Sequence, residues 1–163
     1  MRRRHSDDWR LMAADQGGLL ARRQLIALGH PSQFVDDQVA AQRWQHVSEV
    51  VVCTTTGALS RVQLMWAGVL HAGPGSAVGG LTALELRGLR GWHREEVTVL
   101  LAKSHNLRPL EGVRFVETRR PVGLHAFGRP PAWRTEPAAL LFAAYAPSSR
   151  TALGLLAASS SSG

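Results

Sequence analysis

Residues 18–53, GLLARRQLIALGHPSQFVDDQVAAQRWQHVSEVVVC, determine how the rest of the chain is interpreted, because they contain two helical patterns separated by a turn. The first pattern predicts a helix from about Leu19 to Leu28. The Gly-His-Pro that follows ends it, since proline cannot continue a helix. Ser32 is the expected N-cap of a second helix over Gln33–Gln42. Two helices joined by a short turn that contains glycine are typical of a helix-turn-helix.

Strand-forming residues follow the second helix. Trp44–Val47 and Val50–Cys53 flank Ser48 and Glu49, an arrangement that predicts a short β-hairpin. A further helix is expected before the motif at Asp8–Asp15, where two glycines end it. Together these elements predict an α+β fold with a winged helix-turn-helix head, whose second motif helix commonly enters a DNA major groove.

The segment GLLARRQLIALGHPSQFVDDQVAAQRWQHV, residues 18–47, resembles the N-terminal winged-helix domain of AbiEi-type antitoxins. These are the regulator halves of bacterial type IV toxin–antitoxin pairs. The resemblance continues through SRVQLMWAGVLHAGPGSAVGGLTALELRGLRG at 60–91 and VTVLLAKSH at 97–105. The same opening precedes a very-short-patch-repair-like endonuclease domain in many actinobacterial proteins. The resemblance implies a transcriptional regulator that represses its own promoter, with double-stranded DNA and a nucleotidyltransferase-like toxin as partners.

The rest of the chain is expected to form a second, mainly helical domain over residues 57–158. It would lie between the head at 1–56 and a disordered Ser-rich tail at 159–163. The predicted helices of this domain are Leu59–His71, Ser76–Leu86, Ala138–Ala146 and Arg150–Ala158. Its predicted strands, Glu95–Ala102 and Val113–Thr118, are expected to pair as a β-hairpin that covers the preceding helices.

The chain is strongly basic, with a formal charge of +7 and an isoelectric point near 11.3. Such a balance favours nucleic acid as a partner. The alternative is an Arg-rich composition unrelated to phosphate binding, because all but one of the 19 basic residues are Arg. A short basic arm over Met1–His5 is expected either to be solvated or to follow a minor groove.

The single cysteine, Cys53, excludes an intrachain disulfide and fits a reducing compartment. Asp7 and Asp8 interrupt the basic N-terminus, so no signal peptide is expected. No segment approaches the roughly 20 consecutive apolar residues that a membrane span needs. We therefore expect a soluble, cytoplasmic protein with no membrane contact.

The residues expected to bind DNA lie on both motif helices and at the root of the hairpin. Basic side chains are assigned to phosphates, whereas a hydroxyl and an amide at the start of the second helix approach base edges. The full set is Arg22, Arg23, Ser32, Gln33, Arg43 and His46. Two acids on the same helix, Asp36 and Asp37, would repel phosphates, so a protein-binding face is the alternative interpretation. Many such regulators bind as homodimers on two half-sites, although this sequence contains no heptad repeat.

No catalytic or metal-binding pattern is found in the sequence. The seven histidines have no zinc-ligand spacing to one another or to the cysteine. The carboxylates that hold the metal ions of a nuclease are missing, and the segment 123–163 contains a single acid, Glu136. We therefore expect no enzyme activity and no cofactor or metal. Three functions stay open: a DNA-binding regulator, a protein-interaction module that binds a toxin or another partner without DNA affinity, and a truncated remnant of an endonuclease-domain protein.

Overall fold

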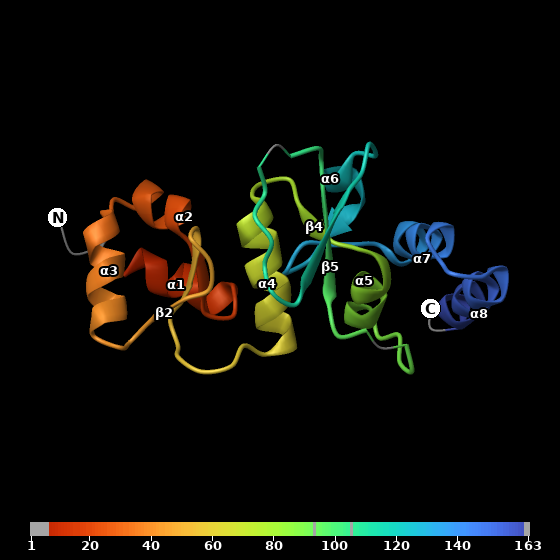
Figure 1. The fold of residues 1–163 in the computed structure, drawn as a ribbon, viewed down its shortest axis with the longest axis horizontal. Coiled ribbons are helices and arrows are strands. Elements are labelled where there is room, and N and C mark those ends of the chain that lie inside the picture. Colours follow the sequence, from red (N-terminus) through yellow and green to blue (C-terminus); the bar gives the residue numbers. More distant parts are fainter. Residues whose placement is uncertain (1–6, 93, 105, 162–163) are drawn as a thin grey trace.

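The computed structural model describes residues 7–92, 94–104 and 106–161 of the chain (Figure 1). The basic arm over Met1–His5 and the last two residues of the Ser-rich tail lie outside these described residues. The described part has a mixed α+β fold, with two β-sheets and helices packed around both. Within it, no helix is both long enough and apolar enough to cross a membrane.

The N-terminal part, which we call the head, folds around a three-stranded antiparallel sheet. Its elements in chain order are α1 (Asp8–Asp15), β1 (Leu19–Ala21), α2 (Arg22–Ala27), α3 (Ser32–Ala40), β2 (Gln45–His46) and β3 (Val51–Cys53). The strand order is β1-β3-β2, with Leu19 opposite Cys53 and His46 opposite Val52. The predicted first helix and the predicted hairpin are confirmed, although both hairpin strands are shorter than expected.

The prediction of a helix over Leu19–Leu28 is wrong at its start. Gly17 and Gly18 have φ values of 64° and 90°, which turn the chain just before Leu19. The next three residues form β1, pair along β3 and are fully buried. Burial between two layers of side chains outweighs the helix propensity of Leu and Ala, which amounts to little free energy over only three residues.

The boundaries of the second motif helix also differ from the prediction. Pro31 occupies the N-cap position of α3, so Ser32 is the first helical residue and not the cap. The helix ends at Ala40, and Gln42 adopts the left-handed region with φ of 56°. This left-handed residue turns the chain back toward the head sheet, and Trp44 is buried between that sheet and the head helices.

Side chains cover both faces of the head sheet. One face packs against the three head helices through a cluster formed by Ala13, Leu20, Leu25, Val35, Trp44 and Val52. The other face packs against α4 (Arg61–Ala72) through a cluster formed by Leu19, Ala21, Val51, Cys53, Trp66, Ala67 and Leu70. Neighbouring residues of β1 and β3 therefore alternate between the two clusters, as the pleat of a strand requires.

A five-stranded mixed sheet forms the second half of the structure, in the order β6-β5-β4-β8-β7. Its strands are β4 (Ala77–Val78), β5 (Val97–Leu101), β6 (Val113–Glu117), β7 (Ala126–Phe127) and β8 (Ala132–Trp133). β5 and β6 are parallel, with Val97 opposite Val113, so the predicted hairpin between these two strands is wrong. Parallel pairing requires the segment 102–112 to run back along the sheet before β6 begins.

The predicted helix over Ser76–Leu86 is divided into β4 and α5 (Gly80–Leu86). Gly79 separates the two elements and is extended, with φ of −137°. A Cβ atom at this position would lie only 2.3 Å from Cγ of Leu100. The absence of a side chain therefore lets the chain pass close to β5 before α5 begins.

Helices cover both faces of the second sheet (Figure 1). α4 lies on one face, where Gly68 allows it to approach Val99 and Val113 closely. α5 and α7 (Thr135–Ala144) lie on the other face, and α8 (Ser149–Ser160) packs outside α7. The short α6 (Val122–His125) precedes β7. α8 continues through Ser160 and so includes the start of the tail that was predicted to be disordered.

Candidate nucleic-acid interface

An aromatic cluster fixes α3 against α1. The Phe34 ring centroid lies 5.5 Å from that of Trp44 and 6.1 Å from that of Trp9, and the two tryptophans meet edge to face at 4.9 Å. His30 stacks on Phe34 at 4.5 Å, so the turn before α3 is held as well. Because Val35 is buried beneath the helix, the opposite face of α3 is open to solvent.

The exposed face of α3 carries Ser32, Gln33, Asp36 and Asp37. Asp36 forms an ion pair with Arg22 of α2 at 3.4 Å, and the Gln33 amide donates a hydrogen bond to Asp37 at 2.8 Å. Arg22 therefore offsets part of the acidic charge of α3. Gln33 would have to leave Asp37 before its amide could pair with a base edge.

Arg23 contacts α4 and not α3. Its guanidinium donates a hydrogen bond at 2.8 Å to the Leu70 carbonyl oxygen, which lies in the last turn of α4 where carbonyls lack helical partners. Burial lowers the pKa of Arg23 below its usual value, because desolvation disfavours the charged form. This position fits a bond that joins the head to α4 better than the predicted phosphate contact.

Arg43 borders an open hollow of about 410 Å³ beside α3. The hollow is lined by Trp9, Arg10, Phe34, Gln38, Arg43 and Trp44. Arg10 comes from α1, where it forms an exposed ion pair with Asp7 at 2.9 Å. Two guanidinium groups from different elements thus border one hollow, an arrangement suited to neighbouring phosphate oxygens. Sequence reasoning missed Arg10, because nothing in the local pattern of α1 places it near Arg43.

The turn of the β2–β3 hairpin is held by the second half of the molecule. Glu49 forms an ion pair with Arg108, and the Ser48 hydroxyl shares a hydrogen bond with Nδ1 of His71 at 2.9 Å. Nε2 of the same histidine lies 2.7 Å from the Arg108 carbonyl oxygen. The hairpin turn, α4 and the loop at 106–111 therefore meet at one point, beside an open cavity of about 500 Å³. His46 stays exposed on β2.

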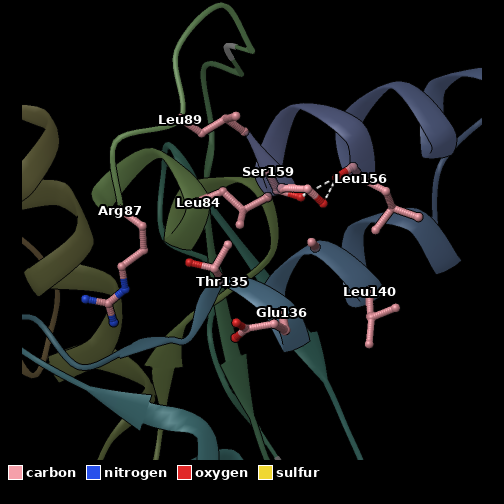
Figure 2. A pocket seen from close by; sticks show the side chains of 10 residues that line it. Leu84, Arg87, Leu89, Thr135, Glu136, Leu140, Leu156 and Ser159 are labelled. Carbon is pink, nitrogen blue, oxygen red and sulfur yellow. Dashed lines mark hydrogen bonds between the residues drawn. The ribbon is translucent and has the colours of Figure 1, made fainter. Parts of the chain in front are cut away.

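A separate cavity of about 420 Å³ lies between α5, α7 and α8 (Figure 2). Arg87 lies at its edge, where its guanidinium donates hydrogen bonds to the carbonyl oxygens of Ala132 at 2.9 Å and Phe127 at 3.1 Å. Burial, together with the nearby charge of Arg134, lowers the pKa of Arg87. The hydrophobic lining comprises Leu84, Leu89, Ala139, Leu140 and Leu156. The polar lining comprises Thr135, Glu136, Ser159 and Ser160, so the cavity combines an apolar wall with one carboxylate and several hydroxyl groups.

Reactive chemistry is sparse in the part of the chain that the structure describes. In that part, no group of three or more His, Cys, Asp or Glu side chains is placed to hold a metal ion. Cys53 is fully buried in the head sheet, with its Sγ 3.2 Å from Oγ1 of Thr55. Its surroundings are those of a small buried hydrophobic side chain.

No known protein-family model matches the sequence, and no curated protein matches it either. The candidate interface is therefore interpreted from its own geometry. Ser32 and Gln33 lie on the exposed face of α3, whereas Arg43 and the unpredicted Arg10 border the hollow on the side of α3 that carries Phe34 and Gln38. Arg22 and Arg23 are engaged with Asp36 and with α4, whereas His46 lies on the hairpin.

Proposed function

We propose that the chain is a DNA-binding transcriptional regulator whose head is a winged helix-turn-helix. The observation that carries the proposal is the element order α1-β1-α2-α3-β2-β3 around a β1-β3-β2 sheet, with one face of α3 open to solvent. In winged helices the equivalent helix is the one that enters the major groove. The formal charge of +7 and the resemblance to AbiEi-type antitoxins support the same function.

In this proposal, α3 contacts the groove while arginines beside it position the duplex. Arg10 and Arg43 bind phosphate oxygens at the hollow, and Ser32 and Gln33 approach base edges at the start of the helix. Asp37 would accept a hydrogen bond from cytosine N4 once Gln33 leaves it. These contacts predict a preference for an operator that contains cytosine near the centre of the α3 footprint.

The hairpin turn has a smaller part in this mechanism than in a winged helix with a free wing. Its Glu49 is paired with Arg108, and its Ser48 is bonded to His71, so the turn is not extended toward a phosphate backbone. His46, which stays exposed on β2, is the hairpin residue left to contact DNA. The affinity should therefore come mainly from α3 and the two arginines.

The decisive experiment measures fluorescence anisotropy of a labelled duplex from upstream of the gene, against a scrambled duplex, across a salt series. Tight binding to the first duplex alone, weakening steeply with salt, supports the proposal. The double substitution Arg10→Gln and Arg43→Gln should lower the slope of log K against log salt by about 0.9 for each lost phosphate contact. Arg150→Gln on α8 is the matched control, because it removes an exposed arginine outside the head. Equal, weak binding to both duplexes would contradict the proposal.

A second candidate function is a protein-interaction module. The observation in its favour is the exposed acidic pair Asp36 and Asp37 on α3, which suits a basic partner. The resemblance points to a nucleotidyltransferase-like toxin as that partner. Replacing both acids with Lys separates the two functions: it should strengthen duplex binding by a regulator and abolish partner binding by an interaction module.

A further inference from the structure

We propose that a pocket between the second sheet and α7 binds a small, single-ring aromatic carboxylate. The pocket has a volume of about 90 Å³ and opens between β5, β6, the start of α5 and the end of α7. Its lining residues are Gly80, Leu81, Arg94, Thr98, Arg114, Val116, Leu141, Phe142 and Tyr145. This set combines apolar and aromatic walls with two arginines, and it contains no acidic residue.

The aromatic wall of the pocket is held in place by its neighbours. The Phe142 ring meets Trp92 edge to face, with centroids 6.2 Å apart and planes at 78°. The Arg94 guanidinium carbon lies 5.2 Å from the same ring centroid, close enough for a cation–π contact. Tyr145, by contrast, is 69% exposed at the rim. A flat ring that enters the pocket would therefore find one fixed aromatic partner and one that is free to adjust.

The charge around the pocket selects for an anion. Arg94 and Arg114 are both exposed, and within the described ranges neither guanidinium forms an ion pair with a carboxylate. Arg114 extends from β6 on the same side of that strand as Val116, whereas Val113 packs toward α4. A guanidinium pairs with a carboxylate through two parallel hydrogen bonds, which fixes the orientation of the bound group.

The volume limits the ligand to one ring. An apolar protein cavity of about 150 Å³ holds a benzene molecule, so a cavity of about 90 Å³ encloses only the inner edge of a single ring, and the rest of the ring and its substituent stay in the open mouth. A purine with its ribose is larger than this space. The ligand class that satisfies both size and charge is a benzoate-like acid whose ring contacts Leu81 and Phe142 and whose carboxylate pairs with Arg94 or Arg114.

The pocket is separate from the proposed DNA contacts, so this inference does not depend on the proposed function. Most of its lining residues belong to α5, α7 and the strands that these helices cover. Figure 1 shows α5 and α7 on one side of the second sheet, with α4 and the head on the other. Substitutions in one site should consequently leave the other unchanged. Arg43→Gln is therefore a suitable control for the pocket, and Arg114→Gln for the DNA face.

The test is isothermal titration of benzoate into the full chain, with acetate and benzyl alcohol as probes that lack the ring or the charge. We expect one benzoate per chain, with each probe bound about tenfold more weakly or worse. Arg114→Gln should weaken benzoate binding about tenfold, and Arg43→Gln should leave it unchanged. Circular dichroism of each variant verifies that the fold is retained.

Four results would overturn the proposal. They are no heat of binding up to the solubility of benzoate, equal binding of acetate, equal binding of benzyl alcohol, and tighter binding of adenosine monophosphate. Equal binding of acetate would mean a generic contact between arginine and any anion. Equal binding of benzyl alcohol would mean an apolar pocket that does not recognise charge. The last would mean that the arginines and Phe142 form a nucleotide platform at the surface and not a pocket for one ring.

Discussion

His71 of α4 and Ser48 in the hairpin turn share a hydrogen bond of 2.9 Å between Nδ1 and Oγ. Nε2 of His71 faces the Arg108 carbonyl oxygen, which can only accept, so Nε2 carries the proton and donates. In the neutral ring Nδ1 then accepts from the Ser48 hydroxyl. The Ser48 oxygen in turn accepts the backbone N–H groups of Val50 and Val51, at 3.3 and 3.2 Å. One imidazole thereby fixes the hairpin turn on the second half of the molecule.

The substitution His71→Phe should release this turn. Phenylalanine keeps a ring against Phe115, on which His71 stacks at 5.6 Å, but it removes both hydrogen bonds. The loss should cost about 1 kcal/mol of stability and lower Tm by about 3 °C. Hydrogen exchange of the amides at 47–51 should become faster. His46→Gln on the exposed strand is the control, and unchanged exchange in the His71 variant would contradict the role given to this histidine.

Arg23→Met should destabilise the protein without weakening DNA binding. Methionine keeps most of the aliphatic stem of Arg23 but removes the hydrogen bond to the Leu70 carbonyl oxygen. We expect a loss of about 1 kcal/mol in chemical denaturation. Duplex affinity measured by anisotropy should stay at the wild-type level. A lower slope of log K against log salt in this variant would show instead that Arg23 contacts a phosphate.

Gly79→Ala should be strongly destabilising. The added methyl would lie 2.3 Å from Cγ of Leu100, and that side chain is fully buried and cannot move aside cheaply. Overpacking of this kind costs about 2 kcal/mol, read as a lower midpoint in urea denaturation. Gly123→Ala in α6 is the control, since nothing lies within 4 Å of its added methyl. That variant should be neutral or slightly more stable.

The thiol of Cys53 should be protected in the native protein. It is fully buried between the head sheet and α4, so a disulfide reagent reaches it only when the sheet opens. We expect the rate of Cys53 modification to be at least about 100-fold lower than in denaturant. The rate is measured from the absorbance of the thiolate that the reagent releases. Rapid modification under native conditions would show that the head and α4 separate readily.

Elements with strong local signals could be predicted from the sequence. The helix at Asp8–Asp15 is followed by two glycines, and the strand at Val97–Leu101 is a run of β-branched and apolar residues. The burial of Trp44 also follows from its size and its place after α3. In each case the deciding information lies within a few neighbouring residues.

Elements that depend on distant partners could not be predicted. Leu19–Ala21 becomes a strand only because Val51–Cys53 lies beside it. Leucine and alanine on their own favour a helix. β4 contains two residues, too few to leave a periodic pattern. The same limit applies to the site: Arg22 and Arg23 are adjacent in sequence, yet one pairs with α3 and the other with α4.

α4 lies between the head and the second sheet (Figure 1). It belongs to both hydrophobic cores, with Trp66 and Leu70 in the cluster of the head and Met65 and Val69 in the cluster of the second sheet. Cutting the chain at residue 56 would break only a loop, but it would remove α4, which covers one face of the head sheet. The separated head would present the apolar face of its sheet to water and tend to aggregate. For this protein, heat or denaturant should melt the two halves in one step, and the smallest piece that folds on its own should include α4.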